Sequence, residues 1–162
     1  MMPILKNNIT IKILKLSANS ISDQGIKVFA EQYLAESSYL LELYLKWNSI
    51  TSEGGKCIAE ALQQNNNLSV LDLSYNRLGV SYPKIKSCSS ILKAISQKSS
   101  SMKHLDISFN QICVQELKEI ANILEDNHTL FGLHLSGNSD NICFMDQRGH
   151  LKFKGEQLPT NN

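Results

Sequence analysis

The sequence has almost no net charge. Its 16 Lys and Arg residues balance 15 Asp and Glu residues, which leaves a formal net charge of +1 over 162 residues. A nucleic-acid-binding protein needs a basic face, so this composition gives no support for nucleic acid as a partner. With 42% apolar and 19% charged residues, the chain is unlike a disordered one. It is long enough for one domain with a sizeable core.

Long apolar runs and closely spaced cysteines are also lacking. No stretch approaches the roughly 18 apolar residues that cross a bilayer, and the opening MMPILKNNIT lacks the apolar core of a signal peptide. No CxxC motif occurs, and no histidine sits at zinc-finger spacing from a cysteine. We therefore expect a cytoplasmic protein without membrane association, metal or cofactor. We also expect free, mostly buried thiols at Cys57, Cys88, Cys113 and Cys143.

An internal repeat is the dominant feature of the chain. The pattern apolar-x-x-Leu-x-Leu-x-x-Asn, with Ile for the second Leu in the fourth copy, occurs at 11–19, 40–48, 68–76, 102–110 and 130–138. Successive asparagines are 29, 28, 34 and 28 residues apart. They are Asn19, Asn48, Asn76, Asn110 and Asn138. Self-similarity at such a period indicates supersecondary units that stack on one another.

Each repeat predicts a short strand followed by a helix. The apolar residues at the fourth and sixth positions alternate with polar ones, which is the period of a strand with one inward face. After the second block, Thr51 or Ser52 can cap a helix whose buried face is formed by Ile58, Ala59 and Leu62. Such a small unit cannot bury its own faces, so stacking must supply the core. The asparagine amides, placed where each strand ends, should bond to the turns and form a ladder.

These blocks resemble leucine-rich repeats of the longer subtype found in ribonuclease inhibitor, NOD-like receptors and Ran GTPase-activating protein. The run NSITSEGGKCIAEALQQN, from Asn48 to Asn65, fits that subtype closely. The resemblance implies an α/β solenoid, or horseshoe, of about five strand–helix repeats. Its parallel strands would line the concave side and its helices the convex side.

The pattern changes at the ends of the chain and in the third repeat. We expect 1–10 to be the end of a partial preceding repeat, 11–138 the repeats, 139–154 a hairpin cap and 155–162 a loose tail. The third repeat is six residues longer than its neighbours, with the extra material near 79–90 and the helix resuming at Ile91. This insertion is either a length variant without a role or a protruding contact loop open to phosphorylation. The protein is expected to be a monomer or part of a larger chain.

Outward strand positions should form columns across the sheet, about 4.8 Å apart between adjacent strands. Three consecutive repeats place an aromatic residue before the asparagine, namely Trp47, Tyr75 and Phe109. Aromatic residues dominate binding hot spots, although rings at this position also often just pack on one another. We predict that these rings bind a partner protein together with a polar set that consists of Glu42, Tyr44, Lys46, Asp72, Ser74, His104, Asp106 and His134.

Asp72 and Asp106 should be neighbours, and like charges on adjacent strands repel, so a cationic group of the partner would suit them. A metal ion on both aspartates and His134 is conceivable. Ser108, His104 and Asp106 have the composition of a hydrolase triad. These three side chains, however, lie splayed along one strand, and no glycine elbow for an oxyanion hole is present. We therefore predict a non-enzymatic scaffold that binds a protein on its concave face.

Two other functions fit the same resemblance. The first is a regulator of a small GTPase similar to the Ran activator, although the chain has fewer repeats than that family and lacks its acidic tail. The second is a ligand-sensing fragment of a larger NOD-like receptor.

Overall fold

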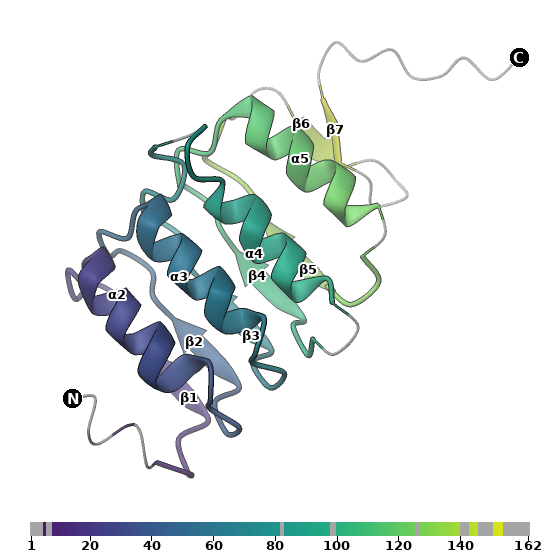
Figure 1. Ribbon diagram of the computed structural model, residues 1–162. Coiled ribbons are helices and arrows are strands. Elements are labelled where there is room, and N and C mark those ends of the chain that lie inside the picture. Colours follow the sequence, from purple (N-terminus) through teal and green to yellow (C-terminus); the bar gives the residue numbers. More distant parts are fainter. Residues whose placement is uncertain are drawn as a thin grey trace, which may run out of the picture.

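The computed structural model describes residues 5, 8–81, 83–97, 100–125 and 127–139, together with strands at 143–145 and 151–153. Strands and helices alternate along the chain, and the helices lie side by side in sequence order (Figure 1). The elements of the repeats are β1 (Ile13–Lys15), α2 (Asp23–Phe29), η1 (Ala30–Leu34), β2 (Glu42–Tyr44), α3 (Ser52–Leu62), β3 (Val70–Asp72), α4 (Ser87–Ile95), β4 (His104–Asp106), α5 (Val114–Leu124) and β5 (Gly132–His134).

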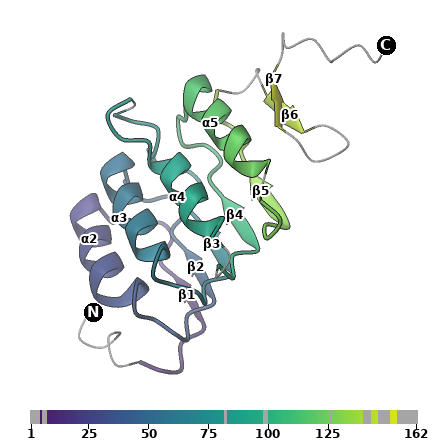
Figure 2. The same ribbon diagram turned by 45° about the vertical axis from the view of Figure 1, so that its right-hand side comes forward.

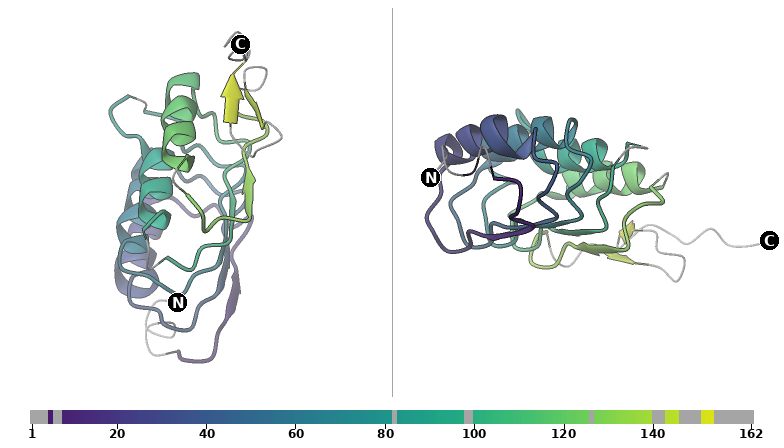
Figure 3. Two further views of the ribbon diagram at one scale, coloured as in Figure 1. Left: turned by 90° about the vertical axis from the view of Figure 1, so that its right-hand side faces the viewer. Right: turned by 90° about the horizontal axis from the view of Figure 1, so that it is seen from below.

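The five strands form one parallel sheet in the order β1-β2-β3-β4-β5. Equivalent residues of successive blocks are partners, so that Leu43 is paired with Leu71 and Leu71 with Leu105. The helices cover one face of this sheet, and the strands form the second layer (Figure 3). The predicted solenoid with its parallel sheet is therefore confirmed.

The core lies between the sheet and the helices. In the second, third and fourth repeats, the inward residues of each block are at most 2% exposed. They are Leu40, Leu43, Leu45, Leu68, Leu71, Leu73, Met102, Leu105 and Ile107. The equivalent residues of the first and fifth repeats are only half-buried, because among the described residues each of these repeats stacks against one neighbour. They are Ile11, Leu14, Leu16, Leu130, Leu133 and Leu135.

The block asparagines form the predicted ladder, in which the second to fifth amides bond to the preceding repeat. Asn48 accepts hydrogen bonds from the N–H groups of Asn19 and Ile21 and donates to the Leu16 carbonyl. Asn76 accepts from the Ile50 N–H and donates to Leu45. Corresponding bonds are made by Asn110 and Asn138. This asparagine ladder satisfies buried turn groups that have no strand or helix partner.

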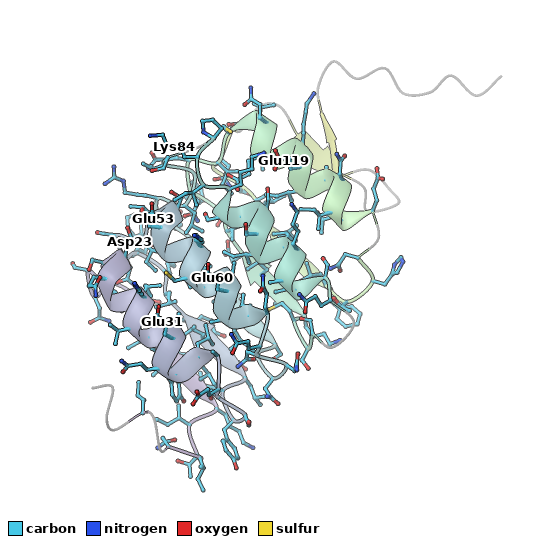
Figure 4. The ribbon with its side chains drawn as sticks, in the orientation of Figure 1. Asp23, Glu31, Glu53, Glu60, Lys84 and Glu119 are labelled. Carbon is cyan, nitrogen blue, oxygen red and sulfur yellow. The ribbon has the colours of Figure 1, made fainter. Side chains whose placement is uncertain are left out.

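Acidic side chains also join neighbouring helices. Asp23, at the start of α2, accepts hydrogen bonds from the N–H groups of Thr51 and Gly54, beside the first turn of α3 where Glu53 is labelled (Figure 4). Thr51 itself is the N-cap of α3, as predicted, and accepts from the Glu53 N–H. Glu116 of α5 likewise accepts from the Ser89 N–H in the first turn of α4. A carboxylate at a helix N-terminus is favoured by the free N–H groups and by the helix dipole.

Glu116 gives the fold a predictable pH dependence. It is fully buried, one of its carboxylate oxygens has no hydrogen-bond partner, and burial raises its pKa above the ordinary value. The folded protein therefore keeps this proton to a higher pH than the unfolded chain. The resulting stability is fully present below the unfolded pKa and declines as the pH rises through the folded pKa.

We expect the melting temperature to fall between about pH 4 and pH 7, and to fall less in Glu116→Gln, which is neutral throughout this range. The measurement is thermal unfolding followed by circular dichroism at both pH values. Glu53→Gln, an exposed change in the first turn of α3, is the matched control and should leave the difference unchanged. An equal fall in wild type and Glu116→Gln would contradict this assignment.

The insertion differs in part from expectation. Helix α4 begins at Ser87, earlier than the predicted Ile91, and the pairing of Val70 with His104 shows that the sheet register is kept despite the longer crossover.

Strands β6 (Cys143–Met145) and β7 (Leu151–Phe153) pair antiparallel, as a hairpin requires, beyond β5 and α5 (Figure 2). That this hairpin caps the repeats stays a prediction. The expected tail at 155–162 lies outside the described residues, as does most of 1–10.

The three cysteines whose side chains are described are free thiols. Cys88 is buried as expected, whereas Cys57 and Cys113 are only half-buried. Burial raises the pKa of the Cys88 thiol well above its ordinary value, which keeps it protonated and unreactive. In the part of the chain that the structure covers, no helix combines the length and apolar character needed to cross a membrane.

Candidate functional site

The candidate site is the face of the sheet turned away from the helices, which we call the open sheet face (Figure 3). Side chains alternate across a strand, so the residues beside each inward leucine point to this face. The predicted columns are in register. One column consists of Ile13, Glu42, Val70, His104 and Gly132, and the next of Lys15, Tyr44, Asp72, Asp106 and His134.

Trp47, Tyr75 and Phe109 lie side by side where β2, β3 and β4 end, and we call them the aromatic ladder. The ring centroids are 4.3 Å apart in both steps, and the ring planes are inclined by 18° and 14°. Trp47 and Phe109 nevertheless remain 58% and 42% exposed. The predicted side-by-side placement of the three rings is therefore confirmed, and the stack leaves aromatic surface open to solvent.

The ladder rests on an unusual backbone conformation. Trp47, Tyr75 and Phe109 have φ values of 56°, 55° and 53°, in the left-handed region that residues other than glycine rarely adopt. Ala18 and Gly137, at the same position of the first and last blocks, also have positive φ values. The turn before each asparagine is thus the same in all five repeats, and it directs every ring the same way. The sequence pattern contained no signal for this conformation, because the three rings are bulky residues.

The two ends of the ladder differ. A Cβ atom on Gly137 would lie 2.1 Å from the Phe109 ring, so this ring packs directly over the glycine. At the other end stands Ala18, whose side chain is a single methyl group. One face of the Trp47 indole is therefore left without a ring partner, which accounts for its high exposure.

Two lysines and one glutamate contact aromatic side chains on the open sheet face. The Lys46 ammonium lies 4.8 Å from the centroid of the Tyr75 ring, and the Lys15 ammonium lies 5.6 Å from that of Tyr44. The Tyr44 hydroxyl donates a 2.8 Å hydrogen bond to Glu42. This bond, burial and the charge of Glu42 raise the pKa of Tyr44, so the phenol stays protonated. Cation–π contacts of this kind hold the lysine side chains over the open sheet face.

The two aspartates are neighbours, as predicted, and each is hydrogen-bonded to a serine two residues further along the chain. Asp72 accepts hydrogen bonds from the N–H and hydroxyl of Ser74, and Asp106 accepts the same pair from Ser108. Each carboxylate is thus stabilised within its own strand. Ser74 is almost completely buried, so it orients Asp72 and does not face the solvent.

The arrangement does not form a catalytic triad. Ser108 is buried and its hydroxyl donates to Asp106, whereas the serine of a triad donates to a histidine that the carboxylate orients. His104 instead stacks on His134, with 5.6 Å between the ring centroids. Within the described ranges, no three His, Cys, Asp or Glu side chains gather as a metal-binding group.

Sequence reasoning missed the most exposed large apolar residue of the described part of the chain. Phe131 is 82% exposed, and the Lys103 ammonium lies 5.3 Å from its ring centroid. Both residues occupy the second position of a block, beside the columns that were considered. The available signal was an aromatic residue at a position where the other blocks carry Lys12, Leu41, Ser69 and Lys103.

Stacked strand–helix units with an open parallel sheet define a solenoid repeat protein. The Leucine Rich repeat family model matches residues 7–30, 36–59, 64–81 and 98–112, which together make up half of the chain. The chain belongs to the leucine-rich repeat family. Proteins of this family are protein-interaction modules, and the ribonuclease-inhibitor-like subtype predicted from the sequence is supported by the relatives below.

Ribonuclease inhibitor of Sus scrofa is 28% identical to the chain over 135 residues, which are 83% of the chain and 28% of the relative. The NACHT, LRR and PYD domains-containing protein 4C of Mus musculus is 25% identical over 136 residues, which are 84% of the chain and 13% of that protein. The chain thus spans less than a third of the length of either relative. Neither of them is named as an enzyme.

Two solved structures share the fold. The actin-binding site 2 of leiomodin-1 superposes with a TM-score of 0.72 at 20% identity, covering 83% of this chain and 76% of that one. The tropomodulin C-terminal domain of Caenorhabditis elegans also gives 0.72, at 15% identity, covering 91% and 83%. At these identities the likeness concerns the fold alone.

Proposed function

We propose that the chain binds a partner protein on its open sheet face, the concave side expected for this fold, and that the aromatic ladder is the anchor. The single observation that carries the proposal is the stack of three rings on left-handed turns, with Trp47 58% exposed. Proteins ordinarily bury most of the area of such rings. Aromatic side chains that remain accessible often contribute a large share of the binding energy of an interface.

The ladder is suited to binding because it is ordered in advance. Each ring is held by its neighbour at 4.3 Å, and the repeated turn fixes the direction in which each ring projects. Little rotamer freedom is therefore lost when a partner docks, which improves affinity for a given buried area. Backbone strain at non-glycine residues is typical of sites where position matters more than stability.

Charged residues on the same face would set the preference for a partner. Glu42 lies on β2, and the Lys46 ammonium lies over the Tyr75 ring. Asp72 is paired with Asp106 on the next strand, and the imidazoles of His104 and His134 stack beside them. Complementary charge acts mainly on specificity and association rate. In this arrangement Tyr44 holds Glu42, and Ser74 holds Asp72, while both carboxylates remain available.

Relatives support a protein as the partner class. The curated relative with 28% identity is named for inhibition of ribonuclease, which is a protein. Fold-level likeness alone does not choose a partner, since function resides in the surface residues. We therefore leave the partner's identity to direct capture.

The test is affinity capture from cells that express the protein, followed by a binding titration with the purified captured partner. We expect Trp47→Ala and Tyr75→Ala each to weaken binding by about tenfold or more, as hot-spot residues do. Alanine fits the left-handed turn, because Ala18 already adopts φ 57° at the equivalent position. Thermal unfolding should therefore change little, which separates a binding defect from misfolding.

Lys27→Glu is the matched control on the helix side. Lys27 is exposed on α2. The side chains labelled along α2, η1 and α3 are all acidic (Figure 4). We expect this charge reversal to leave the titration unchanged. If both ring variants bind normally while Lys27→Glu abolishes binding, the partner docks on the helices and the proposal is wrong.

A further inference from the structure

The aromatic ladder has an open ring position next to Trp47. Trp47, Tyr75 and Phe109 stack at 4.3 Å, close to the spacing of about 4.8 Å between adjacent strands, so each strand supplies one ring. The next position toward the amino terminus is Ala18, which is exposed and has the same left-handed turn, with φ 57° against 56° at Trp47. Its main chain is in register, because the Ala18 N–H donates to the Lys46 carbonyl. We call the space above Ala18 the ring gap.

The ring gap follows from the small side chain of Ala18 itself. A ring supplied by any repeat that precedes β1 would stand beyond Ala18, two strand steps or roughly 9.6 Å from the Trp47 ring. Such a ring would form a second wall of the gap and would not close it. Trp47, with a ring on one face, is 58% exposed, whereas Tyr75, with a ring on both faces, is half-buried.

Lysines on the two nearest strand segments make the surroundings of the ring gap positive. Lys15 lies on β1, and the Lys46 ammonium lies 4.8 Å from the centroid of the Tyr75 ring. Within the described residues, no carboxylate forms an ion pair with either lysine. The carboxylate on β2, Glu42, accepts a hydrogen bond from the Tyr44 hydroxyl. A cationic group that enters the gap therefore meets like charge, whereas an acidic neighbour of the entering group is attracted.

We propose that the ring gap receives an aromatic side chain of the partner, which stacks on Trp47 as a fourth ring, and that acidic residues flanking it contact Lys15 and Lys46. The proposal rests on the proposed function, because it names the feature of the partner that the ladder recognises. One ring fills one step of the ladder, and two stacked rings gain energy beyond the area that they bury. An arginine also stacks on indole rings, but the two lysines repel it.

Trp47 is the single tryptophan of the chain, so its fluorescence reports directly on the ring gap. The probe is a short acetylated peptide with one phenylalanine flanked on both sides by glutamate, titrated into the whole protein. We expect a saturable blue shift of the tryptophan emission and weaker quenching by acrylamide, because the indole loses contact with water. A peptide with leucine in place of phenylalanine should bind about two- to tenfold more weakly. One with lysine in place of glutamate should bind about tenfold more weakly.

Ala18→Phe tests the ring gap by filling it. Phe109 shows that phenylalanine adopts this turn, with φ 53°. The new ring should therefore stack on Trp47, shift its emission to the blue without peptide and leave the melting temperature no lower than that of the wild type. Binding of the acidic phenylalanine peptide should weaken by at least about tenfold. Ala18→Gly is the matched control, because Gly137 has φ 70° at the equivalent position. It keeps the gap open and should bind the peptide normally.

Four results would overturn this inference. They are the absence of a saturable shift with the acidic phenylalanine peptide, equal binding of the phenylalanine and leucine peptides, equal binding of the acidic and basic peptides, and unchanged binding by Ala18→Phe. Titration of the captured partner separates this inference from the proposed function. If Trp47→Ala weakens that binding and Ala18→Phe does not, the ladder is the anchor but the ring gap is not used. If neither variant weakens it, the proposed function fails as well.

Discussion

Replacing Asn76 with alanine is expected to lower the free energy of unfolding by about 3 kcal/mol. The Asn76 amide is 4% exposed, accepts from the Ile50 N–H and donates to the carbonyls of Leu45 and Leu73. Alanine leaves the buried Ile50 N–H without this acceptor, at a cost of about 1 to 3 kcal/mol. It also removes one of the two bonds at each carbonyl, since Leu45 still accepts from Asn48 and Leu73 from Asn110. The measurement is urea unfolding followed by circular dichroism, with the slope of the transition checked for constancy.

Asn19→Ala is the control for the same substitution in the same motif. The Asn19 amide is exposed and makes one bond, to the Ser17 carbonyl of its own turn. Its loss should cost less than about 0.5 kcal/mol, as is usual for a surface change. Similar losses at Asn19 and Asn76 would mean that the bonds between repeats do not determine stability.

Gly79→Ala is expected to destabilise the fold by about 3 kcal/mol. A Cβ atom on Gly79 would lie 2.1 Å from the carbonyl oxygen of Gln111 and 2.7 Å from the Cα of Ile112. Both atoms belong to the backbone of the next repeat, which cannot yield as a flexible side chain does. The Gly79 N–H also donates to the Asn110 carbonyl, so separating the two repeats would break this bond. Urea unfolding measures the loss.

Gly25→Ala should have the opposite sign. A Cβ there meets a single atom, the γ2 methyl of Ile21 at 3.1 Å, which a shift of a few tenths of an ångström relieves, and the site is inside α2. Alanine has a higher helix propensity than glycine, by up to about 1 kcal/mol. We expect a gain of about 0.5 kcal/mol. If both substitutions destabilise the fold to the same extent, the contact with Ile21 outweighs the gain in helix propensity at Gly25.

The sequence was sufficient for the architecture because stacking multiplies a weak signal. One block such as that ending at Asn76 is short and ambiguous, but five in register require parallel strands with shared columns. The column from Lys15 to His134 and the order of Trp47, Tyr75 and Phe109 followed directly from that register. That these residues bind a partner stays a prediction.

Local hydrogen-bond choices could not be predicted in the same way. The turn of Asp72 toward Ser74 depends on χ angles and on the nearest available donor, not on spacing. The pairing of Glu116 with the Ser89 N–H depends on how the first turn of α4, which follows the insertion, packs against α5. Helix α4 began earlier than expected because Ser87 and Cys88 are buried, and serine in the sequence had suggested an exposed loop.

All the amides in the second to fifth blocks reach toward the repeat that precedes them, and this gives the array a direction during biosynthesis. A turn such as that at Asn48 is completed only when Asn76, synthesised 28 residues later, has left the ribosome. At a usual rate of translation this delay is about 1 to 6 s. The nascent chain therefore carries one incomplete turn at its growing end at every moment, and each new repeat finishes the one made before it.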